Sequence, residues 1–283
     1  MIKVISSVPE MVRFCRRVKE RGQKIALVPT MGALHEGHLS LVAAAKAKAD
    51  ILVVSIFINP IQFSPQEDLK KYPRNLRRDQ LLLKPFAPLT LFNPSPADLY
   101  PKDFDTYVEE KVLSPKLCGQ FRPGHFRGVT TVVAKLFNII QPDHAFFGEK
   151  DFQQQLIIKK MVVDLSYPLE IVILPTVREY DGLALSSRNS YLKPGERKSA
   201  TILYRALTRG KEDIESGESD AHKILLNMKR LIAFEPAIRL EYLVIADPKT
   251  LEPLKRVRGR VLLALAARVG STRLIDNLVV CPK

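Results

Sequence analysis

The chain has 283 residues, of which 46% are hydrophobic and 26% are charged, and its formal net charge is +14. This composition is typical of a globular protein with a sizeable core and excludes a fibrous or wholly disordered chain. No apolar run approaches the ~18 residues of a membrane span, which excludes a transmembrane protein. The 44 Lys and Arg residues are dispersed among 30 Asp and Glu residues. The charge therefore indicates a basic surface or a small cationic pocket, and it does not favour a nucleic-acid partner.

Two further features bear on where the protein works. Residues 1–7 lack the apolar core and the cleavage site of a secretory signal, so we expect a cytoplasmic protein with no membrane partner. Cys15, Cys118 and Cys281 lie far apart without a CxxC pair. Their spacing predicts neither a disulfide framework nor a zinc site.

Five apolar segments rich in β-forming residues alternate with segments of helical periodicity. They are residues 24–29, 51–58, 89–92, 144–147 and 170–174. The alternation predicts a parallel sheet with crossover helices. The run at 51–58 is apolar on consecutive residues apart from Ser55, which predicts a central strand covered on both faces. Residues 38–48 and 129–140 are expected to form two of the crossover helices, the second ended by Pro142. We therefore expect an α/β fold with a Rossmann-like doubly wound parallel sheet.

The pattern changes after Pro175. The expected elements are a polar loop at 181–189, a helix opened by Pro194, a helix capped by Ser219 or Asp220, and strands at 239–245 and 260–266. Helices followed by neighbouring strands predict a smaller α+β domain. We place the boundary near residue 176, so residues 1–176 would form the Rossmann-like domain and residues 177–283 the C-terminal domain.

The most informative segment lies between the first expected strand and a helix that should begin near His38. Gly32 and Gly37 let the backbone approach a ligand, and the start of the helix offers free N–H groups and the positive end of its dipole to a phosphate. His35 and His38 add two donors. The alternatives are a structural turn and a metal site, and the metal site is disfavoured because no third ligand is spaced for zinc.

Two other segments also follow expected strands. Asn59 and Gln62 lie where open α/β sheets bind ligands, and the Gln62 amide suits a substrate with hydroxyls and a carboxylate. Gly148 to Asp151 lie between a strand and a helix, which predicts a second phosphate or ribose site with Lys150 as its cation. The alternatives are an ordinary loop around Gln62 and a surface ion pair between Glu149 and Lys150.

Five ordered motifs make the chain resemble a known family. His35-Glu36-Gly37-His38 is similar to the HxGH signature of the nucleotidylyltransferase-like superfamily, and the longer segment from Pro29 to His38 resembles the pantoate:β-alanine ligase family. The other four motifs are FINPIQF at 57–63, RPGHF at 122–126, FGEKDFQQ at 147–154 and DGLALSSRN at 181–189. The resemblance covers nearly the whole chain and is loose only between Arg78 and Leu117.

The resemblance implies an ATP-dependent acid–amine ligase that converts pantoate to pantoyl adenylate, with release of pyrophosphate, and then lets the amine of β-alanine displace AMP. It also implies Mg²⁺ bound with the nucleotide and a homodimer formed through the N-terminal domain. The residues implied to stabilise the negative charge at the α-phosphate are His38, Lys150 and Arg188. The implied ATP-binding residues are Met31, Gly32, Ala33, Leu34, His35, Glu36, Gly37, His38, Gly148, Glu149, Lys150, Asp151, Val177, Leu185, Ser186, Ser187 and Arg188. The implied binding residues for pantoate and β-alanine are Met31, Asn59, Gln62 and Gln154.

Some positions depart from the family pattern or leave its register open. Leu185 to Arg188 are similar to the superfamily's mobile KMSKS-type loop, with Ser187 and Arg188 where Ser and Lys usually grip phosphates, although the first lysine is missing. Three consecutive glutamines, 153 to 155, leave the register of Gln154 open. No dedicated metal site is predicted, because Mg²⁺ is usually held through substrate phosphates.

Two other functions remain open at this point. A nucleotidyltransferase of the same superfamily would move AMP onto a phosphate ester, and the Gln62 and Gln154 segments argue against it. A basic RNA-binding module would need a continuous basic stripe or exposed stacking aromatics, and the chain contains no Trp.

Overall fold

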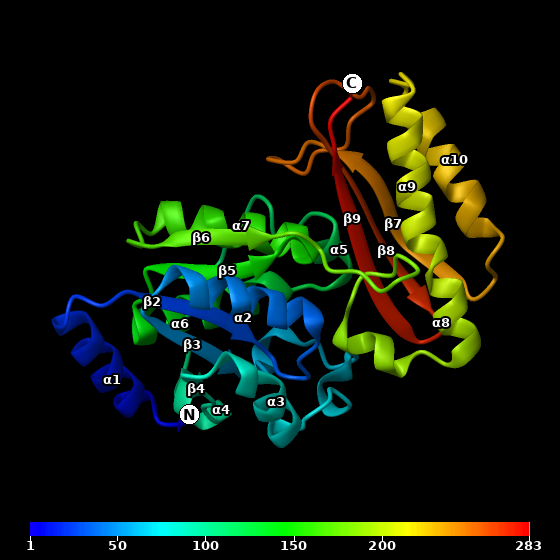
Figure 1. Cartoon of the computed structure of the whole chain (residues 1–283). Helices are drawn as coiled ribbons and strands as arrows, with labels where there is room; N and C mark the ends of the chain where they lie inside the picture. Colours follow the sequence, from blue (N-terminus) through cyan, green and yellow to red (C-terminus); the bar gives the residue numbers. More distant parts are fainter. Residues whose placement is uncertain (283) are drawn as a thin grey trace. The chain divides into compact units, whose positions relative to one another are not determined.

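The computed structural model describes residues 1–282, which divide into two compact units (Figure 1). Unit 1 comprises Met1–Pro115, Arg122–Glu149 and Gln154–Pro175. Unit 2 comprises Lys116–Phe121, Lys150–Gln153 and Thr176–Lys283. The second unit therefore includes two short segments that precede the C-terminal part of the chain. None of the helices in the described part of the chain has the length and hydropathy that a bilayer crossing requires.

Unit 1 is built on a six-stranded parallel sheet with the strand order β1-β4-β3-β2-β5-β6. The strands are β1 (Ile2–Ile5), β2 (Ile25–Thr30), β3 (Ile51–Ile56), β4 (Leu89–Phe92), β5 (His144–Gly148) and β6 (Glu170–Leu174). The five strands expected from the sequence are confirmed, and β3 is an inner strand between β2 and β4. It ends at Ile56, two residues before the expected end.

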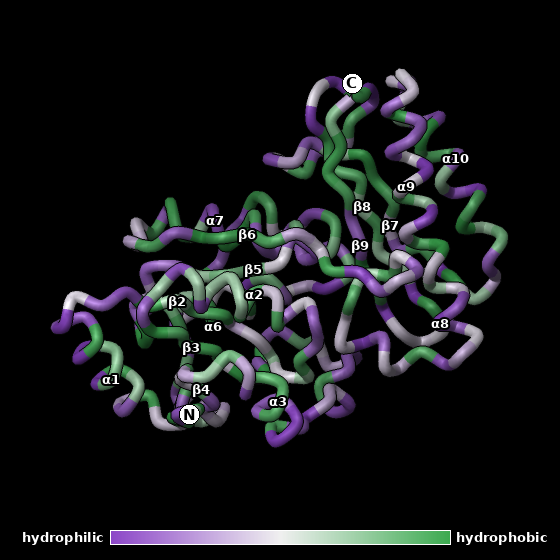
Figure 2. Tube along the Cα trace, in the orientation of Figure 1, coloured by the Kyte–Doolittle hydropathy of each residue, from purple (hydrophilic) through white to green (hydrophobic). Residues whose placement is uncertain are grey.

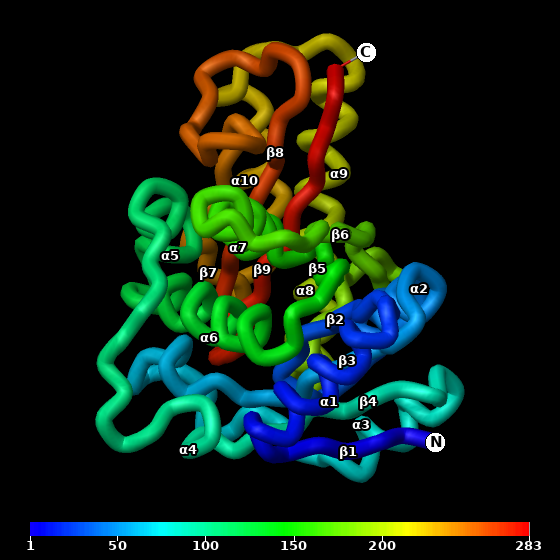
Figure 3. Tube along the Cα trace, turned by 90° about the vertical axis from the view of Figure 1, so that its left-hand side faces the viewer, coloured from blue at the N-terminus to red at the C-terminus, as the bar shows by residue number. Residues whose placement is uncertain are grey.

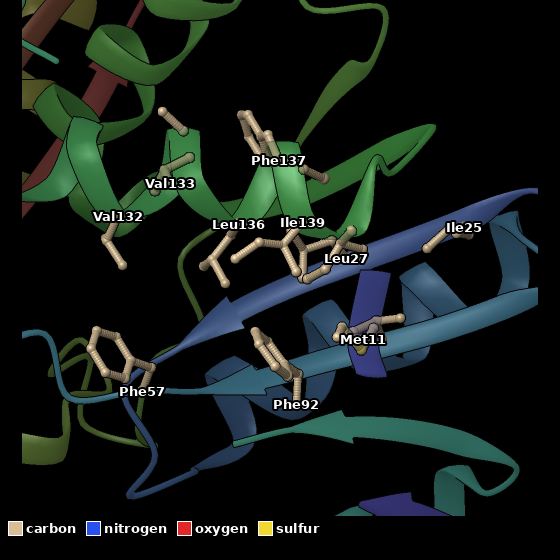
Figure 4. Close-up of a cluster of buried hydrophobic side chains, with 14 of the residues drawn as sticks. Met11, Ile25, Leu27, Phe57, Phe92, Val132, Val133, Leu136, Phe137 and Ile139 are labelled. Atoms are coloured by element: carbon tan, nitrogen blue, oxygen red, sulfur yellow. The ribbon is translucent and has the colours of Figure 1, made fainter. Parts of the chain in front are cut away.

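Helices cover both faces of this sheet. They are α1 (Val8–Glu20), α2 (Glu36–Lys48), α3 (Leu76–Leu83), α4 (Pro96–Leu99), α6 (His125–Ile140) and α7 (Phe152–Asp164). In β2, Ile25 and Leu27 pack into the cluster that contains α1 and α6 (Figure 4), whereas Ala26 and Val28 pack into the cluster that contains α2. Alternate residues of one strand thus enter two different cores. This confirms the doubly wound architecture predicted from the consecutive, non-alternating apolar residues of the strands.

The N-terminal strand β1 was not predicted. It pairs with β4 at one edge of the sheet, with Ile2 opposite Leu89 (Figure 3). Only Ile5 of its four residues is fully buried. An edge strand this short shows too little of the period-2 pattern to be recognised from the sequence.

Unit 2 contains a three-stranded antiparallel sheet in the order β7-β8-β9. Its elements are α5 (Cys118–Phe121), α8 (Pro194–Ala200), α9 (Ile202–Glu215), α10 (Ala221–Ala233), β7 (Ile238–Ala246), β8 (Val261–Val269) and β9 (Thr272–Val280). Residues of α9 and α10 pack with the three strands in one hydrophobic core, which confirms the α+β character. Asp220, and not Ser219, caps α10 by accepting the N–H groups of His222 and Lys223.

Strand β9 is the second strand that the sequence did not reveal. Figure 2 shows β8 hydrophobic along most of its length and β9 interrupted by hydrophilic stretches. The interruptions are Arg273, Asp276 and Asn277, and the last two are 4% and 5% exposed. A strand that contains buried polar residues is not found by a search for apolar runs. Here Asp276 and Asn277 contact loops of unit 2 that contain predicted site residues.

Candidate active site

The turn between β2 and α2 is closed by a buried carboxylate. Gly32 and Ala33 have φ values of 79° and 49°, and such left-handed residues turn successive N–H groups to one side. The N–H groups of Ala33 and Leu34 donate to the two carboxylate oxygens of Asp79 at 3.0 and 2.8 Å. Asp79, on α3, is 1% exposed. These two N–H groups are therefore engaged within the protein, so a phosphate has to be met by other groups of the turn.

Glycine is required at the centre of this turn. The positive φ of Gly32 disfavours any residue with a side chain. In addition, a Cβ atom at this position would lie 3.0 Å from Asp79 Oδ2 and 3.0 Å from Ile56 Cγ2. Leu34 has 0% exposure, so its side chain belongs to the core. Met31, His35 and His38 are half-buried, and Glu36 is exposed.

Helix α2 begins at Glu36, two residues before the expected start at His38. His35 is the N-cap residue, and its N–H donates to His38 Nδ1 at 3.3 Å. The two imidazole rings lie 4.1 Å apart between centroids. Because Nδ1 of His38 accepts, the neutral ring carries its proton on Nε2. His38 therefore has the tautomer in which Nε2 is a donor, as contact with a phosphate oxygen requires.

The loop after β3 contains a buried amide network. Asn59 is 1% exposed, and its Nδ2 donates to Gln62 Oε1 at 2.9 Å and to the Gly128 carbonyl at 3.0 Å. Its Oδ1 accepts from the Tyr100 hydroxyl at 2.8 Å. Gln62 Nε2 in turn lies 3.3 Å from Met31 Sδ. The network fixes which side of the Gln62 amide is the donor, and it brings this loop into contact with the β2–α2 turn.

The proton on Tyr100 is stable across the working pH range. Burial, and to a smaller degree the neighbouring Tyr107, raises the pKa of the Tyr100 phenol well above its ordinary value. Tyr100 therefore remains a donor to Asn59 Oδ1. The orientation of the Asn59 and Gln62 amides consequently does not depend on pH through this residue.

The segment after β5 is divided between the two units. Gly148 ends β5, and Glu149–Asp151 form a single 3₁₀ turn before α7. Gly148, Lys150 and Asp151 are half-buried. Within unit 2, the Lys150 carbonyl accepts from Asn277 Nδ2 at 2.8 Å. A side chain of β9 thus holds the backbone of the turn that presents Lys150.

The three glutamines of α7 differ in their surroundings. Gln153 Oε1 accepts the Cys118 N–H at 3.0 Å, and Gln153 Nε2 donates to the Lys116 carbonyl at 2.7 Å. Gln153 and Gln155 are buried, while Gln154 is half-buried. Gln153 is committed to holding residues 116–118, which leaves Gln154 and Gln155 as the members of the run that could contact a ligand.

In unit 2, the loop that carries Leu185 to Arg188 is anchored to β9. Arg178 donates to both carboxylate oxygens of Asp276 at 2.7 and 2.9 Å. The Leu185 N–H donates to the Val177 carbonyl at 3.0 Å, which pairs the two ends of the loop. Ser186 Oγ then caps the next 3₁₀ turn by accepting the Arg188 N–H at 3.3 Å.

A second set of contacts holds the same loop to α8. Arg197 forms ion pairs with Glu179 and Asp181 at 2.7 and 2.8 Å. The hydrogen bond from Arg197 lowers the pKa of the Asp181 carboxyl, so the pair persists at neutral pH. Asn189 Nδ2 donates to Glu179 Oε1 at 3.0 Å and to the Ala184 carbonyl at 3.1 Å. Val177 and Leu185–Arg188 are thus half-buried residues of a braced loop.

The structure brings together residues that the sequence did not single out. Asp79 lies in the segment that matches the family only loosely, and its one signal was an acidic residue within a leucine-rich helix. Asp276 and Asn277 lie in the strand that was not recognised. These residues contact positions far away in the chain, so no local sequence pattern predicts the contacts.

The fold and these segments together define a class of protein. Two of the segments predicted to bind ligands follow β2 and β3, neighbouring parallel strands of a doubly wound sheet, at their carboxyl ends. One of them carries an HxGH sequence at a helix N-terminus, the position that suits an anion. This arrangement is that of a nucleotide-binding α/β enzyme.

Comparison with known proteins identifies the family within this class. A sequence profile of the family described as pantoate-beta-alanine ligase matches residues 3–279, so the chain belongs to the pantoate–β-alanine ligase family. The chain is 51% identical over 278 residues to pantothenate synthetase of Moorella thermoacetica, which covers 98% of each chain. It is 52% identical over 279 residues to the Thermosipho africanus enzyme, covering 99% of this chain and 100% of the relative.

Solved structures agree with this membership. A crystal structure of pantothenate synthetase from Thermus thermophilus is 45% identical, covers 99% of this chain and 100% of that chain, and superposes with a TM-score of 0.94. A pantoate-beta-alanine ligase from Francisella tularensis, complexed with beta-gamma ATP and beta-alanine, is 34% identical with a TM-score of 0.82, covering 99% and 98%. The chain is therefore an enzyme that ligates pantoate and β-alanine.

Proposed function

We propose that the enzyme performs this ATP-dependent ligation in two stages through a pantoyl adenylate. A carboxylate oxygen of pantoate attacks the α-phosphorus of ATP, and pyrophosphate leaves. The amine of β-alanine then attacks the activated carbonyl carbon, the amide bond forms, and AMP leaves with the carboxylate oxygen. The activation is needed because a free carboxylate is inert to amines. Binding of a nucleotide and β-alanine by the Francisella relative supports this assignment of substrates.

One contact carries the proposal. Gln62 Nε2 lies 3.3 Å from Met31 Sδ, so the loop assigned to pantoate and the turn assigned to ATP touch. The first stage requires a pantoate oxygen to reach a phosphorus atom, and proximity of two bound reactants supplies a large part of such a rate enhancement. Adjacent segments at the ends of β2 and β3 meet that requirement.

We assign His38 to the phosphates. Its Nε2–H donor would stabilise the negative charge that grows on the phosphate oxygens, and loss of one such preorganised donor costs about 100- to 1,000-fold in rate. Lys150 and Arg188, each within unit 2, are proposed as further cationic contacts of phosphate on the strength of the family resemblance. Arginine suits the role because its planar fork binds phosphate oxygens in pairs.

The remaining ATP residues contribute in different ways. We propose that Met31, His35, Glu36 and Gly37 line the nucleotide, and that Ala33 and Leu34 act through the shape of the turn, because their N–H groups are bound to Asp79. The other proposed ATP residues are Gly32, Gly148, Glu149, Asp151, Val177, Leu185, Ser186 and Ser187.

Gln62 and Gln154 are the proposed pantoate ligands. A carboxamide offers both a donor and an acceptor, which matches hydroxyls and a carboxylate. Asn59 has its Nδ2 bound to Gln62 and Gly128 and its Oδ1 bound to Tyr100. We therefore propose that Asn59 orients the Gln62 side chain.

Mg²⁺ is proposed to enter with the nucleotide. Among residues 1–282, no group of three or more His, Cys, Asp or Glu side chains could hold a metal ion. The ion would therefore depend mainly on phosphate oxygens, as Mg²⁺ in nucleotide sites commonly does. It would neutralise part of the phosphate charge.

Assembly and location are proposed on narrower grounds. The homodimer through the N-terminal domain is supported by the family resemblance, and sedimentation of the purified protein tests it. A cytoplasmic location is supported by the free thiols of Cys15, Cys118 and Cys281, since reducing compartments keep thiols unpaired.

Isotope exchange tests the two-stage mechanism. With ATP, Mg²⁺ and pantoate but no β-alanine, labelled pyrophosphate should exchange into ATP, and the exchange should vanish without pantoate. Oxygen-18 in the pantoate carboxylate should appear in AMP. Formation of ADP, or exchange that needs β-alanine, would contradict the adenylate route.

A further inference from the structure

A line of hydrogen bonds leads from a partly buried ion pair to the backbone of Gln62. Arg122 donates to both carboxylate oxygens of Glu67, through Nε to Oε1 and through Nη2 to Oε2. Their side chains are 11% and 17% exposed. Arg122 Nη1 lies 2.9 Å from His125 Nε2, and His125 Nδ1 lies 2.9 Å from the Gln62 carbonyl oxygen. Every residue of this line belongs to unit 1.

The direction of each hydrogen bond follows from the donors available. A guanidinium can only donate, so His125 Nε2 accepts from Arg122. The neutral imidazole then carries its proton on Nδ1, and this N–H donates to the Gln62 carbonyl. Glu67 fixes Arg122 by two parallel hydrogen bonds, an arrangement that restricts the guanidinium to one orientation. The line therefore sets both the position and the tautomer of His125.

The loop also rests on the backbone of α6, in the same first turn that contains His125. A Cβ atom on Gly128 would lie 2.5 Å from the Ile61 carbonyl oxygen and 2.6 Å from Gln62 Cα. Only glycine permits this approach. The Gly128 carbonyl also accepts from Asn59 Nδ2 at 3.0 Å, and that Nδ2 is the group that orients the Gln62 amide. The first turn of α6 thus holds Gln62 at its carbonyl, at its Cα and, through Asn59, at its side chain.

We propose that Arg122, His125 and Gly128 are positioning residues for pantoate, which act by holding Gln62 without touching the substrate. The inference rests on the proposed role of Gln62 as a pantoate ligand. It gives the RPGHF segment a function that the assignment of ATP and pantoate residues left open. Since displacement of a binding group by about 1 Å can cost on the order of 100-fold, a loop held at three points should matter for pantoate far more than for ATP.

A pair of substitutions at His125 tests the hydrogen bond to Gln62. His125→Leu removes the donor and leaves the buried Gln62 carbonyl unsatisfied, so KM for pantoate should rise about 10- to 100-fold while KM for ATP stays within about twofold. His125→Asn places an amide N–H near the position of Nδ1 and should recover most of the loss. A residue needed only for folding would lower the active fraction and leave both KM values unchanged.

Two further variants keep the outcome interpretable. Glu67→Gln retains the shape of the side chain but removes the charge that anchors Arg122, so pantoate KM should rise by a smaller factor, even if His125→Leu fails to fold. Gln62→Ala tests the role on which the inference rests. If Gln62→Ala left pantoate KM unchanged, the assignment of Gln62 would fail. If it raised pantoate KM while His125→Leu and Glu67→Gln matched the wild type, or if His125→Asn were as impaired as His125→Leu, the positioning role would be overturned.

Discussion

The segments that follow β2 and β3 are neighbours, yet opposite chemistry holds them in place. In the turn after β2, backbone donors are gathered by an acceptor, because Asp79 takes the N–H groups of Ala33 and Leu34. In the loop after β3, a backbone acceptor is met by a donor, because His125 gives its N–H to the Gln62 carbonyl. Both braces are buried.

The difference follows from the shape of each segment. A left-handed pair of residues leaves N–H groups converging, which only an anion or several acceptors can satisfy. A loop that runs against a helix leaves a carbonyl pointing at that helix, which needs a donor. The turn should therefore be sensitive to the charge of its brace and the loop to the shape of its support. Substitutions at Asp79 and Gly128 test this contrast directly, and experiments at His38 and Asp143 test a further residue of the turn and the opposite end of β2.

The largest effect is expected at His38, the residue of the turn assigned to chemistry. His38→Ala should slow pyrophosphate exchange about 100- to 1,000-fold and, because it removes the acceptor that caps α2, lower the free energy of unfolding by about 1 kcal/mol. His38→Asn keeps an acceptor near Nδ1 and should restore stability without restoring rate. Urea unfolding and exchange rates measured on both variants separate the two roles. If His38→Asn exchanged pyrophosphate at the wild-type rate, His38 would act only as a cap of α2, and its assignment to the phosphates would be wrong.

Asp79→Asn tests the charge of the turn's brace. The substitution keeps the size of the side chain but turns one acceptor into an NH₂ group that faces a backbone N–H. Loss of a hydrogen bond to a buried charge costs about 1.5 to 3 kcal/mol, so stability should fall and KM for ATP should rise more than KM for pantoate.

The matched control for Asp79 lies at the other end of β2. Asp143 accepts the Ile25 N–H at 2.7 Å, at the amino end of the strand. Asp143→Asn should reduce stability without changing either KM. Equal kinetic losses in the two variants would show that Asp79 supports β2 in general and not the turn.

Gly128→Ala tests the shape of the loop's support. The new methyl group would meet the Ile61 carbonyl at 2.5 Å, so the loop must move, at a cost of about 1 to 3 kcal/mol. KM for pantoate should rise while KM for ATP stays nearly constant. Gly195→Ala is the control, because a Cβ at that position in α8 meets no atom within 4 Å. If Gly128→Ala raised KM for ATP as much as KM for pantoate, the turn after β2 and the loop after β3 would not be held independently, and the contrast would be wrong.

The smallest effect concerns acid stability at Asp143. Burial alone would raise the pKa of this carboxyl, but hydrogen bonds from Lys19 and from the Ile25 N–H together outweigh it and lower the pKa. A depressed folded-state pKa contributes stability that is present above the unfolded-state pKa and is lost as pH falls through the folded value, here below about pH 4.

The measurement is the free energy of unfolding as a function of pH. Because the Asp143 side chain is 31% exposed, the contribution should stay below about 1 kcal/mol. Asp143→Asn should flatten the acid limb of the stability curve by that amount. An unchanged acid limb would place the acid sensitivity in other carboxylates.

The parts of the fold predicted from the sequence are those encoded by local runs. Strand β3 shows this, because both of its faces are buried and its residues are apolar in succession. Strand β9 shows the limit, since Asp276 and Asn277 break the apolar pattern although both are buried. The start of α2 was placed two residues late, because the cap is formed by His35 and His38 instead of the usual Ser, Thr, Asp or Asn.

The same limit applies to the site. His38 and Gln62 stand in short motifs next to strand ends, so sequence was enough to nominate them as ligands. The residues that hold these two segments in place were not found from the sequence. Asp79 lies 46 positions from Ala33, and His125 lies 63 positions from Gln62, and nothing in a single sequence links such positions. Asn59 was nominated as a ligand from its place in the motif, which stays a prediction, and its three hydrogen-bond partners could not be seen in the sequence.

The two polar residues of β9 make the register of one hairpin matter for two loops. β8 and β9 are joined by the two residues Gly270 and Ser271, with Val269 opposite Thr272, and a turn this short fixes how the strands pair. Neighbouring residues of a strand point to opposite faces, so a slip by one position would exchange the faces of Asp276 and Asn277. Arg178 and the Lys150 carbonyl would lose their anchors together. An inserted residue at this turn should therefore disturb both loops at once, so we expect the hairpin to tolerate a change of length poorly.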